Sequence, residues 1–251
     1  MTAEGASMAD HVPAPHPPGA QLAAPTSAVA GAGGRYRVPS TVGLAAVLTG
    51  CVLVAALHVL HHADVDPVRR TISEYALGPT KWLFDLAVLL VATGSGVLFG
   101  VLVHSRTVRP LSPAAFGGAG WTLGLLAVVV FPKTDWSIGP SLAGTIHRYA
   151  SVVAFVALPV AVLAAARAVH PHAPGLRLLT RVLGLASLAW LSLIVGAVRL
   201  MLAGGDPWWR ALPLGLVERG LLATEVAALA VVAAGCLRLR TPAPPSRLVT
   251  S

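Results

Sequence analysis

The feature that most constrains this chain is a series of apolar runs, each long enough to cross a lipid bilayer as a helix. A membrane-spanning helix needs about 20 predominantly apolar residues, and runs of this kind recur between positions 41 and 237. Only 11% of the residues are charged, whereas a soluble domain carries roughly 25%. So small a charged fraction cannot cover the surface of a globule in water. The sequence therefore predicts an integral membrane protein.

The predicted fold is an all-α bundle of six transmembrane helices, formed by residues 39–237. The spans are 41–61, 82–103, 114–131, 147–169, 179–202 and 216–237. The flanking tails, 1–38 and 238–251, are rich in Pro and are expected to be disordered. Two glycine pairs, Gly96/Gly100 and Gly120/Gly124, have a spacing that lets helix backbones approach closely, although such pairs also arise by chance in a chain rich in Ala and Gly.

The distribution of charge predicts how the bundle is oriented. Ten of the 18 Lys and Arg residues lie at the end of the spans that carries both termini, and the other eight lie at the opposite end. The positive-inside rule then places both termini in the cytoplasm. Most acidic residues lie toward the opposite end, where they are available to pair with the basic ones. We expect a multi-pass protein of the plasma membrane.

The net charge of +8 does not indicate a nucleic-acid partner. The basic residues flank apolar runs and form no stripe on a polar domain, which binding to phosphates would require. The expected partners are membrane lipids, with a homo-oligomer as an open alternative.

Three histidines mark the end of the first span. His58 precedes His61 and His62 by three and four residues, so on a continuing helix the rings share one face. Neutral imidazoles at this spacing, together with His147, are candidate zinc ligands. The alternative, which we favour, is a set of interfacial or hydrogen-bonding histidines. A haem held by His58 and His147 is disfavoured because both lie near one face and no second pair exists.

The segment that follows predicts a short helix lying at the extracytoplasmic membrane surface. Asp66 suits the N-cap, Pro67 the first helical position and Gly78 the C-terminal stop. Val68, Ile72 and Tyr75 would then face the bilayer or the bundle. A solvated amphipathic connector is the alternative.

Short motifs on this side of the membrane carry a family resemblance. They are His61, residues 70–76 (RTISEYA), residues 131–135 (FPKTD) and the pair Ile146-His147. From about residue 42 to about residue 237, the chain resembles the bacterial membrane protein family catalogued as domain of unknown function number 998. The resemblance implies a multi-helix membrane protein and brings no established activity. Lys133 departs from the family pattern, in which a small or polar residue is expected at this position.

Three charged residues lie inside the predicted spans: Asp85, Arg199 and Glu225. A charged side chain at the centre of a span costs about 2.5–3.5 kcal/mol on insertion scales, so such residues usually have partners or a function. Asp85 lies in the first turn of its span, where the helix dipole favours an anion. For Arg199 and Glu225 we predict a structural ion pair, with a proton or substrate site at Glu225 as the alternative.

Three functions remain open at this stage. The first is a lipid-interacting or non-catalytic membrane protein with a polar pocket near the extracytoplasmic face. The second is a metal-dependent hydrolase acting on a lipid or amphiphile, and the third is a small proton-coupled transporter. The sequence does not decide whether the chain is an enzyme. The candidate catalytic residues are His61, Ser73, Asp85, Asp135 and His147, and we expect these five to border one outward-facing pocket together with Glu74 and Arg199.

Overall fold

The computed structural model describes residues 34–239, and this part of the chain is helical. Its long helices are α1 (Arg37–Leu60), α2 (Lys81–His104), α3 (Pro113–Val130), α4 (Leu142–Val169), α5 (Pro174–Leu202) and α7 (Leu214–Cys236). Two short helices lie between them: the 3₁₀ helix η2 (Ile72–Ala76) and α6 (Trp208–Ala211). The predicted tails, 1–38 and 238–251, fall mostly outside the described residues.

Five of the long helices, α1 to α5, are long and apolar enough to cross a membrane. Their outer faces expose large apolar side chains, among them Val59 (73%), Leu123 (65%) and Leu200 (67%). Contact of such faces with lipid is favourable, whereas their contact with water would be unfavourable. α7 is not among the five helices and carries Glu218, Arg219 and Glu225. The sixth span therefore stays a prediction.

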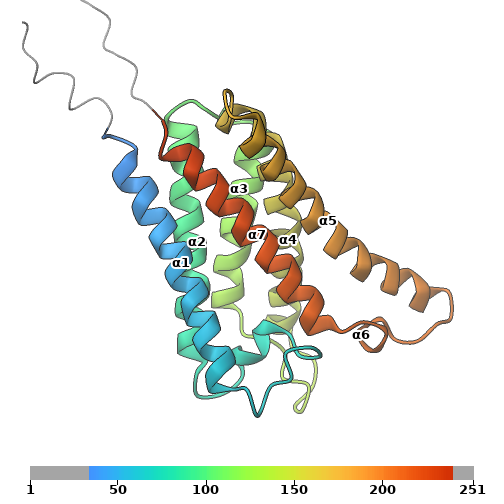
Figure 1. The fold of residues 1–251 in the computed structure, drawn as a ribbon. Coiled ribbons are helices and arrows are strands. Elements are labelled where there is room, and N and C mark those ends of the chain that lie inside the picture. The colour runs from blue at the N-terminus through green and yellow to red at the C-terminus, as the bar shows by residue number, and fades with distance from the viewer. Residues whose placement is uncertain (1–33, 240–251) are drawn as a thin grey trace, which may run out of the picture.

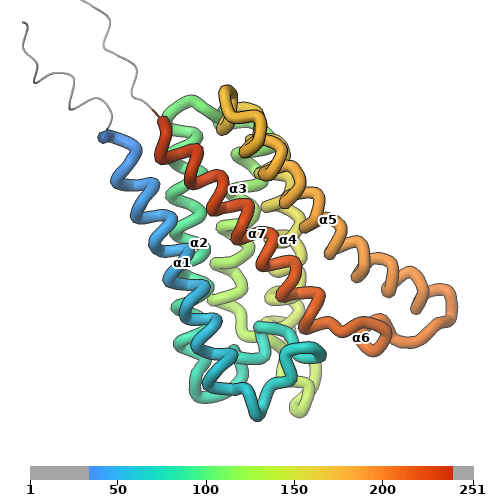
Figure 2. The backbone as a smooth tube through the Cα atoms, in the orientation of Figure 1, coloured from blue at the N-terminus to red at the C-terminus, as the bar shows by residue number. Residues whose placement is uncertain are grey.

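Figures 1 and 2 show how the helices are arranged. α1 to α4 stand side by side, and α7 packs against them with α1 as one neighbour. α1 begins at the end of the bundle where α7 finishes, and η2 lies at the opposite end (Figure 1). α5 packs on α4 and α7 but leans outward toward its C-terminus (Figure 2). Only 11% of its most apolar 18-residue stretch is buried.

Glycines bring α3 and α4 together. A Cβ added at Gly117 would lie 2.6 Å from the carbonyl oxygen of Ala157, and one at Gly124 would lie 2.8 Å from that of Ala150. Backbones this close exclude any larger residue. Of the two predicted glycine pairs, Gly120/Gly124 therefore lies at the α3–α4 contact. In the other pair, a Cβ added at Gly96 would lie 3.2 Å from the Thr122 side chain of α3, whereas one at Gly100 would have no atom within 4 Å.

The helix predicted over residues 66–78 is shorter than expected. Asp66 accepts a hydrogen bond from the Val68 N–H (2.8 Å), but residues 67–70 form turns and only Ile72–Ala76 is helical. The physical reason is that side chains of α7 form hydrogen bonds with backbone groups of this segment. Ile72 N–H donates to Glu218 Oε2 (2.5 Å), and Arg219 donates to the carbonyls of residues 67 and 70. These groups are satisfied without forming the predicted helix.

Candidate functional site

A cavity of about 540 Å³ lies inside the bundle, between α1, α2, α3, α4, α7 and η2. Most of its wall is apolar. Six lining residues are polar or charged: His58, Ser73, His147, Ser151, Glu218 and Arg219.

The cavity has a polar end and an apolar end. On α1 its lining runs from His58 to Cys51, and on α4 from His147 to Phe155. At 1.5 Å per residue these stretches span roughly 10 Å and 12 Å. On α7 the lining runs from Glu218 and Arg219, near the start of the helix, to Val226. Because α1 ends and α4 and α7 begin at the end of the bundle that carries η2, the polar lining residues of these three helices lie toward that end, with Ser151 one turn further along α4 than His147.

The cavity opens at the side of the bundle. Ala55 of α1 and Ala223 of α7 both line it, and both are exposed on the outer surface. α1 and α7 contact each other, and the cavity reaches the surface of the bundle beside these two residues. A molecule in the surrounding lipid could therefore enter without crossing the polar end.

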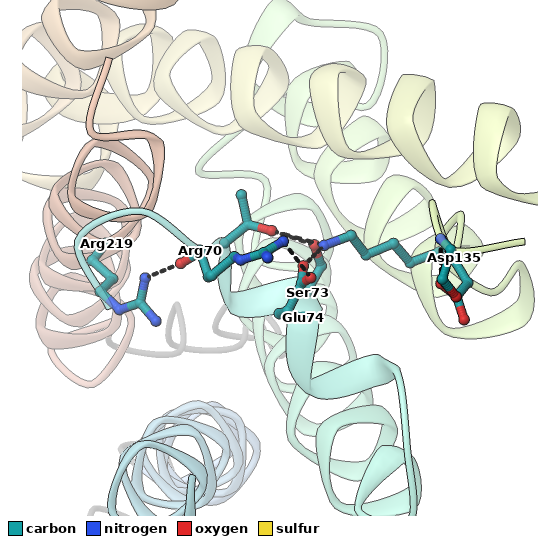
Figure 3. A network of polar contacts seen from close by, with 8 residues as sticks. Arg70, Ser73, Glu74, Asp135 and Arg219 are labelled. Carbon is teal, nitrogen blue, oxygen red and sulfur yellow. Dashed lines mark hydrogen bonds and ion pairs between the residues drawn. The ribbon is translucent and has the colours of Figure 1, made fainter. Parts of the chain in front are cut away.

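Arg219 organises the polar end. Its Nη1 donates to the carbonyl oxygens of Pro67 (2.8 Å), Arg70 (2.7 Å) and Gly215 (3.0 Å). Figure 3 shows the guanidinium pointing at the Arg70 backbone. Its Nε donates to His58 Nε2 (2.6 Å), and its buried Nη2 has no hydrogen-bond partner within the described chain. Arg219 thus fixes the segment after α1 against α7.

The three histidines at the end of α1 do not converge on one point. His58 Nδ1 donates to the Val54 carbonyl (2.7 Å), and His61 Nε2 lies 2.8 Å from Thr80 Oγ1. Both of these rings pack on the buried ring of Tyr75, with centroids 5.2 Å and 5.7 Å away. His62 is exposed and bonds the Val59 carbonyl. The shared face predicted from the spacing therefore holds for His58 and His61, and it contacts an aromatic ring.

His147 is the most enclosed polar group of the cavity wall. Only 5% of it is exposed, its Nδ1 bonds the Phe131 carbonyl (2.9 Å), and its Nε2 has no partner in the described residues. Ser73 also lines the cavity, and its hydroxyl bonds Thr71 Oγ1 (3.0 Å). Of the predicted catalytic candidates, these two border the cavity.

A second network, of ion pairs and a hydrogen bond, lies outside the cavity near its polar end. Lys133 pairs with Glu74 and donates to Thr71 Oγ1 (3.1 Å), which joins the α3–α4 loop to η2. Glu74 also pairs with Arg70 (3.3 Å). Lys133 is thus the centre of a contact between the two segments, 70–76 and 131–135.

Three other candidates lie away from the cavity. Asp85 pairs with Lys81 (2.5 Å) one turn earlier on α2. Asp135 lies apart from Ser73 and Glu74 (Figure 3), and hydrogen bonds from the Ser137 hydroxyl and backbone N–H hold the pKa of this carboxyl below its usual value. His61 contacts Thr80 and Tyr75 as described above. One pocket bordered by all seven predicted residues is therefore not what the structure shows.

The predicted ion pair between Arg199 and Glu225 is not present either. Glu225 is fully buried in α7, and neither of its carboxyl oxygens has a partner among residues 34–239. Arg199 is exposed on α5. The prediction rested on the similar depth of the two residues in the membrane and on the long side chain of arginine. Depth does not determine the direction in which each helix face points.

No group of three or more His, Cys, Asp or Glu side chains within residues 34–239 is placed to hold a metal ion. The candidate ligands His58, His61, His62 and His147 are each engaged with a different neighbour. The geometry therefore gives the zinc hypothesis no support.

These observations define a class of protein: a multi-pass, all-helical membrane protein with an internal cavity that is polar at one end. Residues 22–235 match a family model described as "Protein of unknown function (DUF998)", and the chain belongs to that family. No curated protein and no solved structure shows significant similarity to it.

Proposed function

We propose that this protein binds a lipid-like amphiphile in the cavity, with the polar head beside η2 and the tail among the apolar residues. The observation that carries the proposal is the change of lining from polar to apolar with distance from η2 on α1, α4 and α7, while the lining from α2 and α3 is apolar. An apolar pocket with a few polar groups at one end suits a ligand with the same division.

The polar end also has hydrogen-bonding groups to offer. His147 Nε2 and Arg219 Nη2 are both buried and both lack a partner in the described chain. Buried polar groups are rarely left unpaired, because the unmet hydrogen bond costs about 1–3 kcal/mol. A ligand head would satisfy them.

The opening beside Ala55 and Ala223 supports a ligand that arrives from the membrane. Both are small residues on the outer surface of apolar helices. An amphiphile already dissolved in the bilayer could enter beside these two residues and keep its tail out of water throughout.

The proposal includes an orientation in the plasma membrane, with both termini cytoplasmic and the polar end of the cavity near the outer face. It rests on the charge distribution along the sequence. The test is labelling of intact cells with a membrane-impermeant maleimide at Ile138→Cys and, as the matched control, Leu111→Cys. Both positions are highly exposed, at 87% and 84%, and lie in loops at opposite ends of the bundle. We expect labelling at 138 alone; labelling at 111 alone would invert the orientation.

The binding proposal is tested through Trp121, which is fully buried and lines the apolar end. A dodecyl chain with bromine at its end, added to the protein in phosphatidylcholine nanodiscs, should quench the fluorescence of Trp121 on contact. The comparison is Trp121→Phe, which retains the other five tryptophans. We expect saturable quenching in the wild type that Trp121→Phe lacks. Equal quenching in both proteins would show that no tail reaches the cavity.

A second comparison tests the route. Ala55→Phe places a large ring at the rim of the cavity, whereas Ala45→Phe adds the same ring to an exposed position of α1 away from it. Ala55→Phe should abolish the quenching of Trp121, and Ala45→Phe should leave it unchanged.

A further inference from the structure

We propose that the head of the bound amphiphile is an anion, a phosphate or a carboxylate, that accepts a hydrogen bond from Arg219 and contacts His147. This inference rests on the proposed function and specifies its ligand class. It follows from which hydrogen-bonding groups at the polar end of the cavity have partners and which do not.

The tautomer of His58 is fixed by its neighbours. A carbonyl oxygen can only accept, so Nδ1 carries the hydrogen that it donates to Val54. Nε2 then bears the lone pair that accepts from Arg219 Nε. His58 is therefore a neutral partner that holds the guanidinium in place.

The remaining partners of Arg219 are neutral as well. Nη1 is shared between three backbone carbonyls. A guanidinium is always charged in a protein, and no carboxylate lies within ion-pair distance of it among the described residues. Arg219 is thus held firmly in place while its charge has no direct counter-ion.

The carboxylates nearby are already engaged. Glu218, which also lines the cavity, accepts from the Ile72 N–H, and Glu74 is paired with Lys133 and Arg70. An anionic head would supply the missing counter-ion at Nη2. Because Nε and Nη1 already have partners, the anion would contact Nη2 alone, and the contact would not be bidentate.

His147 presents a complementary group. Its Nδ1 donates to the Phe131 carbonyl, so in the neutral ring Nε2 is an acceptor. It can take a hydrogen from a P–OH or COOH group, and when protonated it donates to the anion instead. An oxygen-rich acid suits both states, whereas a trimethylammonium head suits neither.

The experiment extends the Trp121 quenching assay to a set of heads on one tail. Four dodecyl probes with bromine at the tail end carry a phosphate, a carboxylate, an uncharged sugar or a trimethylammonium group. Trp121→Phe, titrated with the same four probes, measures quenching that does not come from Trp121. The comparison among the four probes uses the wild-type protein, and thermal unfolding checks that the baseline variant is folded.

We expect the phosphate or the carboxylate probe to bind at least about tenfold more tightly than the sugar probe, which corresponds to one charge-assisted hydrogen bond. The tighter of the two anionic probes identifies the acid. Arg219→Gln and, separately, His147→Phe should reduce this preference, with thermal unfolding as the check that each variant is folded.

The possible failures are distinguishable. If all four probes quench Trp121 with equal affinity, the amphiphile site stands and the anionic head is wrong. If the trimethylammonium probe binds best, Glu218 is the partner of the head and the inference is overturned. If no probe quenches the wild-type protein more than Trp121→Phe, the proposed function itself fails.

Discussion

The contact between α3 and α4 and the contact between α1 and α7 show two uses of small residues in one bundle. At the first, Gly117 and Gly124 bring the backbones so close that no side chain fits between them. At the second, Ala55 and Ala223 lie beside an opening into the cavity. Without a hydrophobic force between helices in lipid, close packing of this kind is a main source of association. The α3–α4 contact therefore holds the bundle, and the surface beside Ala55 and Ala223 is where we propose that a ligand enters.

The largest effect should come from filling the α3–α4 contact. Gly117→Ala puts a methyl group against the Ala157 carbonyl and the Ala161 side chain, at 2.6 Å and 2.8 Å. We expect a loss of about 1–3 kcal/mol in the free energy of unfolding, since the α4 backbone must move. Gly100→Ala is the control, because nothing lies within 4 Å of its Cβ. Reversible unfolding in mixed micelles measures both, and equal effects would refute the distinction between the two sites.

A somewhat smaller effect should follow at Gly215, where the segment after α1 lies against α7. An added Cβ would collide with the carbonyl oxygens of Pro67 and Arg70. This segment has no long helix to move, so we expect it to lift away at a cost of about 1–2 kcal/mol. The measurement is tryptic cleavage after Arg69 and Arg70, both exposed, which should become faster in Gly215→Ala. Unchanged cleavage would mean that the segment is held elsewhere.

A smaller effect again should come from the ion pair outside the cavity. The side chains of Lys133 and Glu74 are 15% and 21% exposed, whereas Arg70, the other partner of Glu74, is 65% exposed. We expect a coupling energy of about 1 kcal/mol for Glu74 with Lys133, in a double-mutant cycle of Glu74→Gln and Lys133→Met. The cycle with Arg70→Gln should give less than about 0.5 kcal/mol, as exposed pairs do. The reverse order would assign the contact to Arg70.

The sequence predicted the helices well because apolar length and turn residues are local signals. Phe131-Pro132 ended a helix where expected, and the fifth predicted span overlaps α5. The predicted helix over 66–78 failed for a non-local reason. Its backbone groups are satisfied by Glu218 and Arg219, about 150 positions further along the chain, and no propensity within the segment could show this.

The candidate site was predicted in part. Ser73 and His147 do line the cavity, and His58, proposed as a metal ligand, lines it as well. Arg219 was missed, although an adjacent acidic and basic residue at the start of an apolar run was a usable signal. Asp85 and Asp135 were grouped with the site because they lie at the same depth. Depth follows from the sequence, but the direction in which each side chain points depends on the rotation of its helix.

The smallest expected coupling, and the sharpest test of that limit, is the one between Arg199 and Glu225. Arg199 is exposed on α5, and Glu225 is buried in α7 with no partner in the described chain. Arg199→Gln should therefore change stability by less than about 0.5 kcal/mol, as surface substitutions do. Burial without a cation favours the uncharged acid at Glu225, so Glu225→Gln, which keeps the shape, should also change little. Glu225→Leu should stabilise the protein by about 1 kcal/mol or more, because it removes a polar group with unmet hydrogen bonds.

The double variant Arg199→Gln/Glu225→Gln decides whether the two residues interact. Its effect should equal the sum of the single effects within about 0.5 kcal/mol. A larger coupling would mean that the two side chains meet in the membrane and that the ion pair predicted from the sequence exists.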